Sequence, residues 1–490
     1  MISRYVKEQK RYSREELKDM FEVSEEQLIN IIKKLKEFNV LKAVKNEKKQ
    51  MDMSELLDED VEVVDEENMS IKHLYVFTFV GIIIVESLIL KCYPKYITNE
   101  DSFLENKMCQ IMRVLRKYDA KEQIIKLYND GDNNKAFNLL AAMVYLINDY
   151  YENGLYTNEQ QIVEVNGSGN IDWNRTINQT YPIIQGNTPY YMELHTRKRV
   201  IDDYNFFKKL HEIVLTECSK EIKKADLLNI LDLNEIELSE DELCDLGDRE
   251  YIIYRIQNER NIQFNTRKQE LLSIIEAYIS RKGSLYDIDN FSMFGTNSFN
   301  LVWEEVCAKI LDNKLEQPIG TINALKKIDK SYNPESKLIS IIEKPHWSGY
   351  NAGTMFTVDA NDTLIPDLIS IQIVDGMVEF DIFDAKYYVT RINEKGVKGQ
   401  PGIESITKQY LYQLAYKEFI KKSNIDRVNN CFLMPSDEEQ VDIQGNVRMD
   451  MMFMFELEDI KVRKIPATYA YHKYITGRNI KIKKLKLNEE

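Results

Sequence analysis

The chain has 490 residues, of which 43% are hydrophobic and 10% aromatic, and its formal net charge is -15 at pH 7. A chain of this length is too long to fold around one ordinary hydrophobic core, so we expect two or three domains. The excess of acidic residues argues against a protein that binds nucleic acid through charge alone. The six cysteines form no Cys-x-x-Cys pair, which predicts reduced thiols and no structural zinc site. The start MISRYVKEQKRYS is polar, and the most apolar run, residues 75–97, is interrupted by Glu86, so we expect a cytoplasmic protein without a membrane span.

Residues 1–48 resemble a small winged-helix domain. SREELKDMF and VSEEQLINIIKKLKEFNV each begin with a Ser followed by Glu or Gln at capping-box spacing, which predicts two helices, the second ending at Asn39. LKAVK, residues 41–45, predicts a wing strand. The second helix presents an acidic and polar surface, either to a DNA major groove or to a protein, and both alternatives stay open. That surface comprises Glu25, Glu26, Gln27, Asn30 and Lys34.

A strongly acidic stretch, residues 49–70, is expected to be a solvated linker. After it, residues 71–100 predict strands paired around Glu86-Ser87, and three helices are expected at 102–118, 120–130 and 135–156. Residues 164–194 return to strand-like composition, with turns at Gly167-Ser-Gly169 and Gly186-Asn187. Gly167-Ser-Gly169 is not followed by the Gly-Lys-Ser/Thr that ends a Walker motif, and no Walker motif occurs elsewhere in the sequence. We therefore expect that this chain does not itself hydrolyse nucleotide.

The stretch IPDLISIQIVDGMVEFDIFDAKYY, residues 365–388, predicts a β-hairpin, because apolar residues alternate with polar ones around Asp375-Gly376. Asp-Gly favours a two-residue type I′ turn, which pairs Val374 with Met377. Opposed residue numbers then sum to 374 + 377 = 751, and 367 + 384 gives the same sum, so Asp367 faces Asp384.

Lys386 follows Asp384 by two residues and therefore projects from the same face of the strand. Two carboxylates and an ammonium group at one place are what a Mg²⁺-dependent hydrolytic site requires. The alternative interpretation is the solvated charged face of an edge hairpin.

Pro366-Asp367, sixteen residues and then Asp384-Ala385-Lys386 resemble the PD-(D/E)XK nuclease signature, and FDAKYY resembles its form in McrC-like and LlaJI-family restriction endonucleases. The resemblance implies a restriction-endonuclease-like α/β domain at residues 284–490, in which Asp367 and Asp384 bind Mg²⁺ and Lys386 is catalytic. VGIIIVESLILKCYPKYI, NDYYENGLY and NGSGNIDWNRTI resemble the N-terminal part of the same proteins. They imply a mixed, McrC-like docking region at 71–283, and hence an α+β multidomain fold.

Two predicted helices carry further candidate residues. Residues 403–421 place Gln409, Tyr412, Gln413 and Tyr416 on one stripe. The resemblance implies that Gln409 and Tyr412 support catalysis; the alternative is an ordinary core stripe. Residues 298–311 predict an amphipathic helix whose Trp-Glu pair resembles that of the LlaJI family, which implies Glu304 as a further metal ligand. Glu305 competes for this role, and either residue is otherwise a solvated helix position.

The resemblance implies a Mg²⁺-dependent endonuclease that acts on double-stranded DNA together with a separate McrB-like AAA+ GTPase subunit, bound through residues 71–235. Homodimerisation for double-strand cleavage stays open. The alternatives are a repair or recombination nuclease that acts alone, a non-catalytic DNA-binding adaptor, and a transcription regulator.

Two further segments suggest DNA contact. Residues 461–486 carry nine Lys or Arg and no acid, which indicates either a segment along the DNA backbone or an exposed basic strand. His346 and Trp347 lie in a predicted loop, where they contact DNA or are simply exposed.

Overall fold

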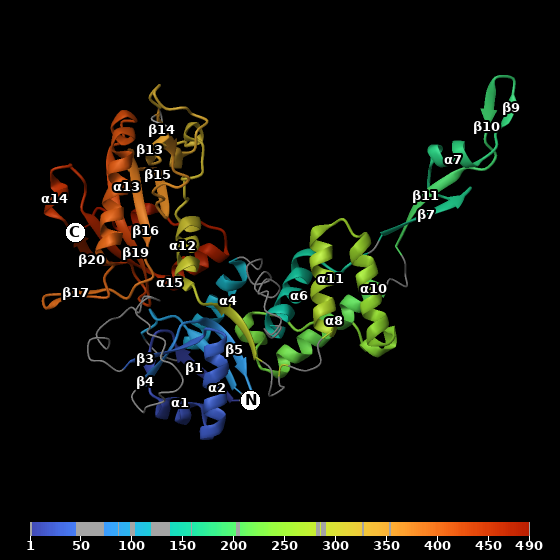
Figure 1. Cartoon of the computed structure of the whole chain (residues 1–490), viewed down its shortest axis with the longest axis horizontal. Helices are drawn as coiled ribbons and strands as arrows, with labels where there is room; N and C mark the ends of the chain where they lie inside the picture. Colours follow the sequence, from blue (N-terminus) through green and yellow to red (C-terminus); the bar gives the residue numbers. More distant parts are fainter. Residues whose placement is uncertain are drawn as a thin grey trace. The chain divides into compact units, whose positions relative to one another are not determined.

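The computed structural model describes residues 2–45, 73–86, 88–98, 103–118, 138–157, 159–201, 206–280, 285, 291–325, 328–351 and 354–489. Its contacts divide the chain into two compact units, residues 1–122, 230–232 and 293–490 in the first and 123–229 and 233–292 in the second (Figure 1). The expected linker at 49–70 and the expected helix at 120–130 lie outside the described residues. The domain limits drawn from the sequence stay predictions.

The first unit begins with the expected pair of capped helices. Helix α1 (Arg14–Phe21) and helix α2 (Glu25–Glu37) both start at a capping box, formed by Ser13 with Glu16 and by Ser24 with Gln27. The expected strand after them is β3 (Leu41–Lys45), which joins β2 (Arg11–Tyr12) and β4 (His73–Phe77) in a sheet of order β2-β4-β3. The sequence prediction for these elements is confirmed.

A second sheet, of order β1-β6-β5-β12, carries the most apolar part of the chain. Strands β5 (Val80–Val85) and β6 (Leu88–Tyr93) pair in antiparallel fashion as expected, and every residue of both is buried, which accounts for their unbroken apolar sequence. Strand β1 (Ile2–Lys7) lies parallel to β6, and β12 (Phe291–Thr296) lies beside β5. The polar sequence of β1 did not predict a strand. Helix α4 (Leu104–Lys117) follows this sheet.

The C-terminal part of the first unit is built on a five-stranded sheet of order β15-β16-β19-β21-β20. Strands β16, β19 and β21 are parallel, and β15 and β20 pair antiparallel at the two edges. The strands are β15 (Leu368–Val374), β16 (Met377–Ala385), β19 (Arg427–Ser436), β20 (Asp442–Val447) and β21 (Ile460–Pro466).

Helices lie against this sheet (Figure 1). Helix α13 (Ile403–Lys422) joins β16 to β19 and packs Tyr416 against Phe380, with ring centroids 5.2 Å apart. Helix α12 (Phe299–Ile310) is the expected amphipathic helix, and its Trp303 indole nitrogen donates to the Leu433 carbonyl of β19 at 3.0 Å. Helix α15 (Ala467–Ile475) packs on α12 through Tyr471 and Trp303.

The basic run at 461–486 is not an exposed strand, and that interpretation was wrong. Its first residues form β21, an interior strand between β19 and β20, and Arg463 is only 1% exposed. The Arg463 guanidinium donates to the carbonyls of Lys486 and Glu489, so it binds the C-terminal segment.

The remaining elements of the first unit are short. They are β13 (His346–Asn351) with β14 (Thr354–Asp359), β17 (Arg391–Asn393) with β18 (Gly396–Lys398), α14 (Asp450–Phe453), and the 3-10 turns η4 (Ile319–Thr321), η5 (Leu338–Ile341) and η6 (Ile482–Leu485).

The second unit combines a helical group with a hairpin-like extension. Its helices are α6 (Leu139–Asn153), α8 (Phe206–Lys224) followed by the short α9 (Leu228–Leu231), η3 (Leu243–Leu246), α10 (Arg249–Ile262) and α11 (Thr266–Ser280). Arg267 of α11 bonds Asp149 of α6 through two nitrogens, at 2.7 and 2.6 Å. None of the helices among the described residues is long and apolar enough to cross a membrane.

The extension contains a helix where strand-like composition was expected. Strands β7 (Glu159–Val165), β11 (His195–Ile201) and β8 (Asn170–Ile171) form one sheet, and β9 (Ile183–Gln185) pairs with β10 (Thr188–Tyr190) across Gly186-Asn187 as predicted. Between them lies α7 (Trp173–Gln179). Asp172 caps α7 by accepting a hydrogen bond from the Arg175 backbone nitrogen. The sequence prediction missed this helix start because the residues on both sides of it have strand-like composition.

Candidate active site

The β15–β16 hairpin brings the two predicted aspartates together. Its register pairs Leu368 with Phe383 and Val374 with Met377, which is the predicted sum of 751. Asp375 and Gly376 both have positive φ, 51° and 87°, as the type I′ turn requires. Asp367 therefore lies at the start of β15 beside the end of β16, and its carboxylate accepts from the Ala385 backbone nitrogen at 2.8 Å.

The pKa of Asp367 is strongly perturbed. Burial, the charge of Asp384, a hydrogen bond with Asp384 and the charge of Glu304 raise it and Lys386 lowers it, with a net result of about 8. Asp384 itself is only 4% exposed. With no cation at this position, Asp367 therefore keeps a proton at neutral pH beside the buried Asp384.

Lys386 projects onto the same face, as expected. Its ammonium nitrogen lies 3.0 Å from an Asp384 carboxylate oxygen, and its backbone nitrogen donates to the Leu433 carbonyl at 2.9 Å. Burial lowers the pKa of Lys386, but Asp384, Asp367 and Glu304 together raise it above its ordinary value. The side chain is therefore a cation at neutral pH.

Helix α12 distinguishes Glu304 from Glu305. Burial raises the pKa of Glu304, with Lys386 lowering and Asp384 raising it, so this carboxyl lies within electrostatic reach of the aspartate pair. Glu305 instead points toward Lys309, 3.8 Å away, and its side chain is 37% exposed. The structure brings Glu304 to the site and leaves Glu305 outside it.

Helix α13 places its polar stripe against β16. Gln409 is fully buried, and its side-chain nitrogen donates to the Ile382 carbonyl at 3.2 Å, while its side-chain oxygen has no hydrogen-bond partner. Burial raises the pKa of Tyr412 to about 12, and Asp384 and Asp367 raise it too, which puts this phenol near the aspartate pair. Tyr412 and Tyr416 both belong to the core cluster around Phe380. The stripe therefore packs in the core, and Tyr412 lies at the part of that core nearest the aspartates.

The donor set suits a hard divalent cation. Mg²⁺ takes carboxylate oxygens and keeps several waters, and a positive ion between Asp367 and Asp384 would offset the negative charge that raises the pKa of Asp367. Within the described part of the chain, no three His, Cys, Asp or Glu side chains are already arranged as ligands of one ion. The residues that would hold such an ion are Asp367, Asp384 and Glu304.

Some residues near the site carried no sequence signal. Tyr387, directly after Lys386, is 5% exposed, and its hydroxyl donates to Glu8, which follows β1. This contact could not be predicted from the sequence, because the two residues are 379 positions apart and the sequence around Glu8 is polar.

His346 and Trp347 were predicted in a loop, but they lie on strand β13, so that prediction was wrong. His346 pairs with Asp359 at 2.7 Å, and the Trp347 side chain is 68% exposed.

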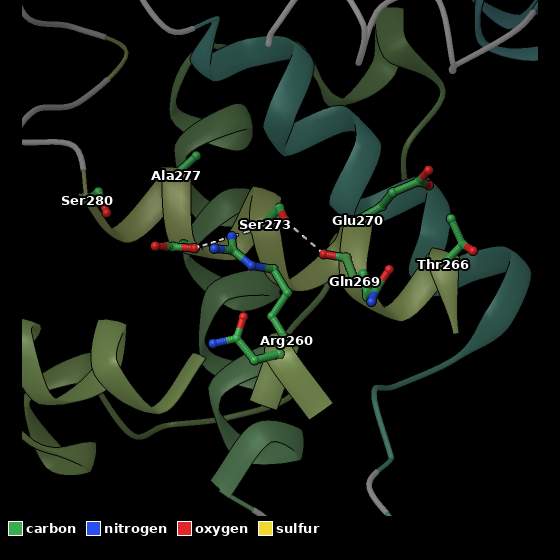
Figure 2. A pocket seen from close by; sticks show the side chains of 9 residues that line it. Arg260, Thr266, Gln269, Glu270, Ser273, Ala277 and Ser280 are labelled. Atoms are coloured by element: carbon green, nitrogen blue, oxygen red, sulfur yellow. Dashed lines mark hydrogen bonds and ion pairs between the residues drawn. The ribbon is translucent and has the colours of Figure 1, made fainter. Parts of the chain in front are cut away.

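A separate cavity lies in the second unit, on helices α10 and α11, with a volume of about 850 Å³ (Figure 2). Arg260, the only basic residue of its lining, bonds Glu276 at 2.5 Å and Ser273 at 3.3 Å. None of the predicted site residues lines this cavity, so it is not part of the aspartate site.

Comparison with known proteins identifies the family. The model of the LlaJI restriction endonuclease family matches residues 79–472, most of the chain, including every predicted site residue. The chain belongs to the LlaJI restriction endonuclease family.

Individual relatives and structures agree with this assignment to different degrees. The LlaJI-family chain is 25% identical over 417 residues to the Type II restriction enzyme BsuMI component YdjA of Bacillus subtilis (strain 168), covering 82% of this chain and 81% of that protein.

Two solved structures, both of Thermococcus gammatolerans, are also similar. A half-complex of McrB AAA+ hexamers with bound McrC gives a TM-score of 0.35 at 12% identity, covering 97% of this chain and 99% of that one. The McrBC complex gives 0.27 at 12% identity, over 64% and 88%. Scores this low carry no argument about this chain.

Proposed function

We propose that this LlaJI-family chain is the nuclease subunit of a GTP-dependent restriction system and hydrolyses DNA phosphodiester bonds with Mg²⁺. The observation that carries the proposal is the pair Asp367 and Asp384 at the open end of the β15–β16 hairpin, with the Lys386 ammonium 3.0 Å from Asp384. The parallel strands and crossing helix beside that hairpin suit a PD-(D/E)XK domain.

Each side chain has a distinct task in this proposal. Asp367 and Asp384 would hold the cation, with Glu304 as the third carboxylate, and Mg²⁺ bound there would supply positive charge to acidify water and neutralise the phosphate. Lys386 is a cation with a raised pKa, so it stabilises the negative charge that builds on the phosphorus oxygens and does not act as the base. The water oxygen forms a bond to phosphorus and gives up a proton, one P–O ester bond breaks, and the leaving oxygen takes up a proton, so one water is consumed for each bond cut. Gln409 and Tyr412 support the geometry from α13.

The proposal includes an McrB-like AAA+ GTPase as a partner, docked within residues 71–235. The sequence has no Walker motif of its own, and the curated relative is named as one component of an enzyme. A dense set of exposed apolar side chains on the extension of the second unit suits such docking. They are Val165, Ile171, Trp173, Ile177, Tyr181, Ile183, Ile184, Tyr190 and Met192.

The test is plasmid cleavage by the purified chain with Mg²⁺, with and without its P-loop partner and GTP. Replacing a metal ligand should remove activity, so we expect Asp384→Asn to cut more than about a hundredfold more slowly than the wild type. Asp381→Asn is the matched control, since Asp381 is equally buried on the same strand but projects from its other face. Cleavage by Asp384→Asn at the wild-type rate would contradict the assignment.

The same assay separates the alternatives. Full activity on DNA ends without partner or nucleotide would favour a repair nuclease, and DNA binding without any cleavage would favour an adaptor or a regulator.

A further inference from the structure

The residue that follows Lys386 is bound by the N-terminal segment of the chain. Tyr387 is buried, and its hydroxyl donates to a carboxylate oxygen of Glu8, which also accepts from the Lys95 backbone nitrogen at 3.1 Å. Glu8 directly follows β1, and its own backbone nitrogen donates to the Tyr93 carbonyl at the end of β6 at 2.9 Å. The carboxylate is therefore fixed to a sheet before it meets Tyr387.

Lys95 reinforces this contact. Its ammonium nitrogen lies 4.7 Å from the centroid of the Tyr387 ring and 3.1 Å from the Gln9 side-chain oxygen. The Glu8 side chain is 6% exposed; burial raises its pKa, and Lys95 and the hydrogen bond from the Tyr387 hydroxyl oppose that rise. A buried carboxylate that accepts two hydrogen bonds beside a cation holds its donors in a defined direction.

Lys386 is fixed on both sides by these contacts. Its backbone nitrogen bonds the Leu433 carbonyl at 2.9 Å, and that carbonyl also accepts from Trp303 of α12 at 3.0 Å. On the other side, the Tyr387 ring packs on Phe299 of α12, with centroids 5.3 Å apart, and its hydroxyl reaches Glu8. The backbone that carries the Lys386 side chain toward Asp384 therefore depends on a residue at the opposite end of the sequence.

We propose that Glu8 is a positioning residue of the nuclease site, which acts through the Tyr387 hydroxyl to set the direction from which Lys386 reaches Asp384. The inference rests on the proposed function and extends it, because it makes the N-terminal strand segment a structural component of the catalytic centre. A displacement of about 1 Å at a catalytic cation is enough to cost up to about a hundredfold in rate.

Four variants test this link in the full chain with its partner, Mg²⁺ and GTP. Glu8→Ala and Tyr387→Phe each remove one end of the bond, and the Phe ring keeps the packing on Phe299. Glu8→Gln keeps an oxygen that accepts from Tyr387. Tyr471→Phe is the matched control, because it removes a buried hydroxyl that accepts from Tyr96 in the same aromatic cluster, at 3.0 Å, without touching the Tyr387 hydroxyl.

We expect kcat for plasmid cleavage to fall about tenfold in Glu8→Ala and in Tyr387→Phe, with KM for DNA unchanged. Glu8→Gln and Tyr471→Phe should stay within about twofold of the wild type. Glu8→Ala and Tyr387→Phe both remove the same hydrogen bond. The double variant that combines these two substitutions should therefore be no slower than either single variant. Wild-type kcat in Glu8→Ala, or additive losses in the double variant, would overturn the proposal.

Amide hydrogen exchange of residues 384–390 in the DNA-free protein provides a measurement that does not depend on cleavage. We expect the Lys386 amide to exchange faster in Glu8→Ala and Tyr387→Phe, and at the wild-type rate in Glu8→Gln and Tyr471→Phe. Exchange at the wild-type rate in Glu8→Ala and Tyr387→Phe would show that Glu8 does not position this segment. If the wild-type chain itself fails to cut, the proposed function fails, and the exchange measurement still decides whether the link exists.

Discussion

Asp381 and Asp384 lie three residues apart on β16, and their surroundings give them different properties. Asp384 faces Lys386 and the open end of the hairpin, whereas Asp381 is fully buried, accepts from Asn429 at 2.6 Å, and has one carboxylate oxygen without a hydrogen-bond partner. The pKa of Asp381 is raised to about 7: burial and the charge of Glu379 raise it, and the hydrogen bond from Asn429 and the charges of Lys461 and Arg427 oppose the rise. The alternation of strand faces separates a site residue from a core residue of the same type.

A pH-dependent stability follows from Asp381. The folded protein keeps a proton on this carboxyl between its ordinary pKa of 3.8 and about 7, where the unfolded chain has released it. The free energy of unfolding must therefore fall as the pH rises through this interval. From pH 6 to pH 8.5 we expect a loss of about 1 kcal/mol from this group, and Asp381→Asn should lack that part of the loss. Urea unfolding of both proteins at the two pH values checks this; an identical pH dependence would contradict it.

At the scale of elements, α12 gives two adjacent acids different surroundings. Glu304 and Glu305 differ by one residue, so they project about 100° apart around the helix axis; the charges of Lys386 and Asp384 act on Glu304, whereas Glu305 lies 3.8 Å from Lys309. The sequence contained both residues and gave no means of choosing between them.

Substitution of each acid in turn tests this assignment. We expect Glu304→Gln to reduce Mg²⁺-dependent plasmid cleavage by at least about tenfold, because a carboxylate ligand is replaced by a neutral amide. Glu305→Gln should cut at the wild-type rate and serves as the matched control on the same helix. A larger loss with Glu305→Gln than with Glu304→Gln would reverse the assignment.

At the scale of the whole molecule, the predicted nuclease site and the predicted docking surface belong to different compact units. The site lies in the unit that contains residues 293–490, and the exposed apolar side chains lie on the extension of the other unit. Changes to the extension should therefore act on partner-dependent activity without altering the site itself.

Tyr181 on that extension provides a direct test, since its side chain is 96% exposed. We expect Tyr181→Asp to weaken binding of the P-loop partner by about tenfold or more and to reduce GTP-dependent cleavage accordingly. Phe264→Asp is the matched control, because Phe264 is 98% exposed in the same unit but outside residues 71–235. Binding can be measured by titration of the purified partner; equal effects of both substitutions would argue against docking at the extension.

The sequence by itself determined the local elements of this protein. The Asp375-Gly376 turn fixed the register of the hairpin, and with it the opposition of Asp367 and Asp384; Ser13 and Ser24 fixed two helix starts. These features depend on residues close together in the chain, so spacing alone is enough to predict them.

Only the tertiary structure decided what depends on distant contacts. It gave Glu304 and Glu305 different surroundings, placed the basic β21 inside a sheet, and joined Glu8 to Tyr387 across 379 residues. The physical reason is that burial and neighbouring charge set the environment of each of these groups, and both are contributed by segments whose proximity no local pattern records.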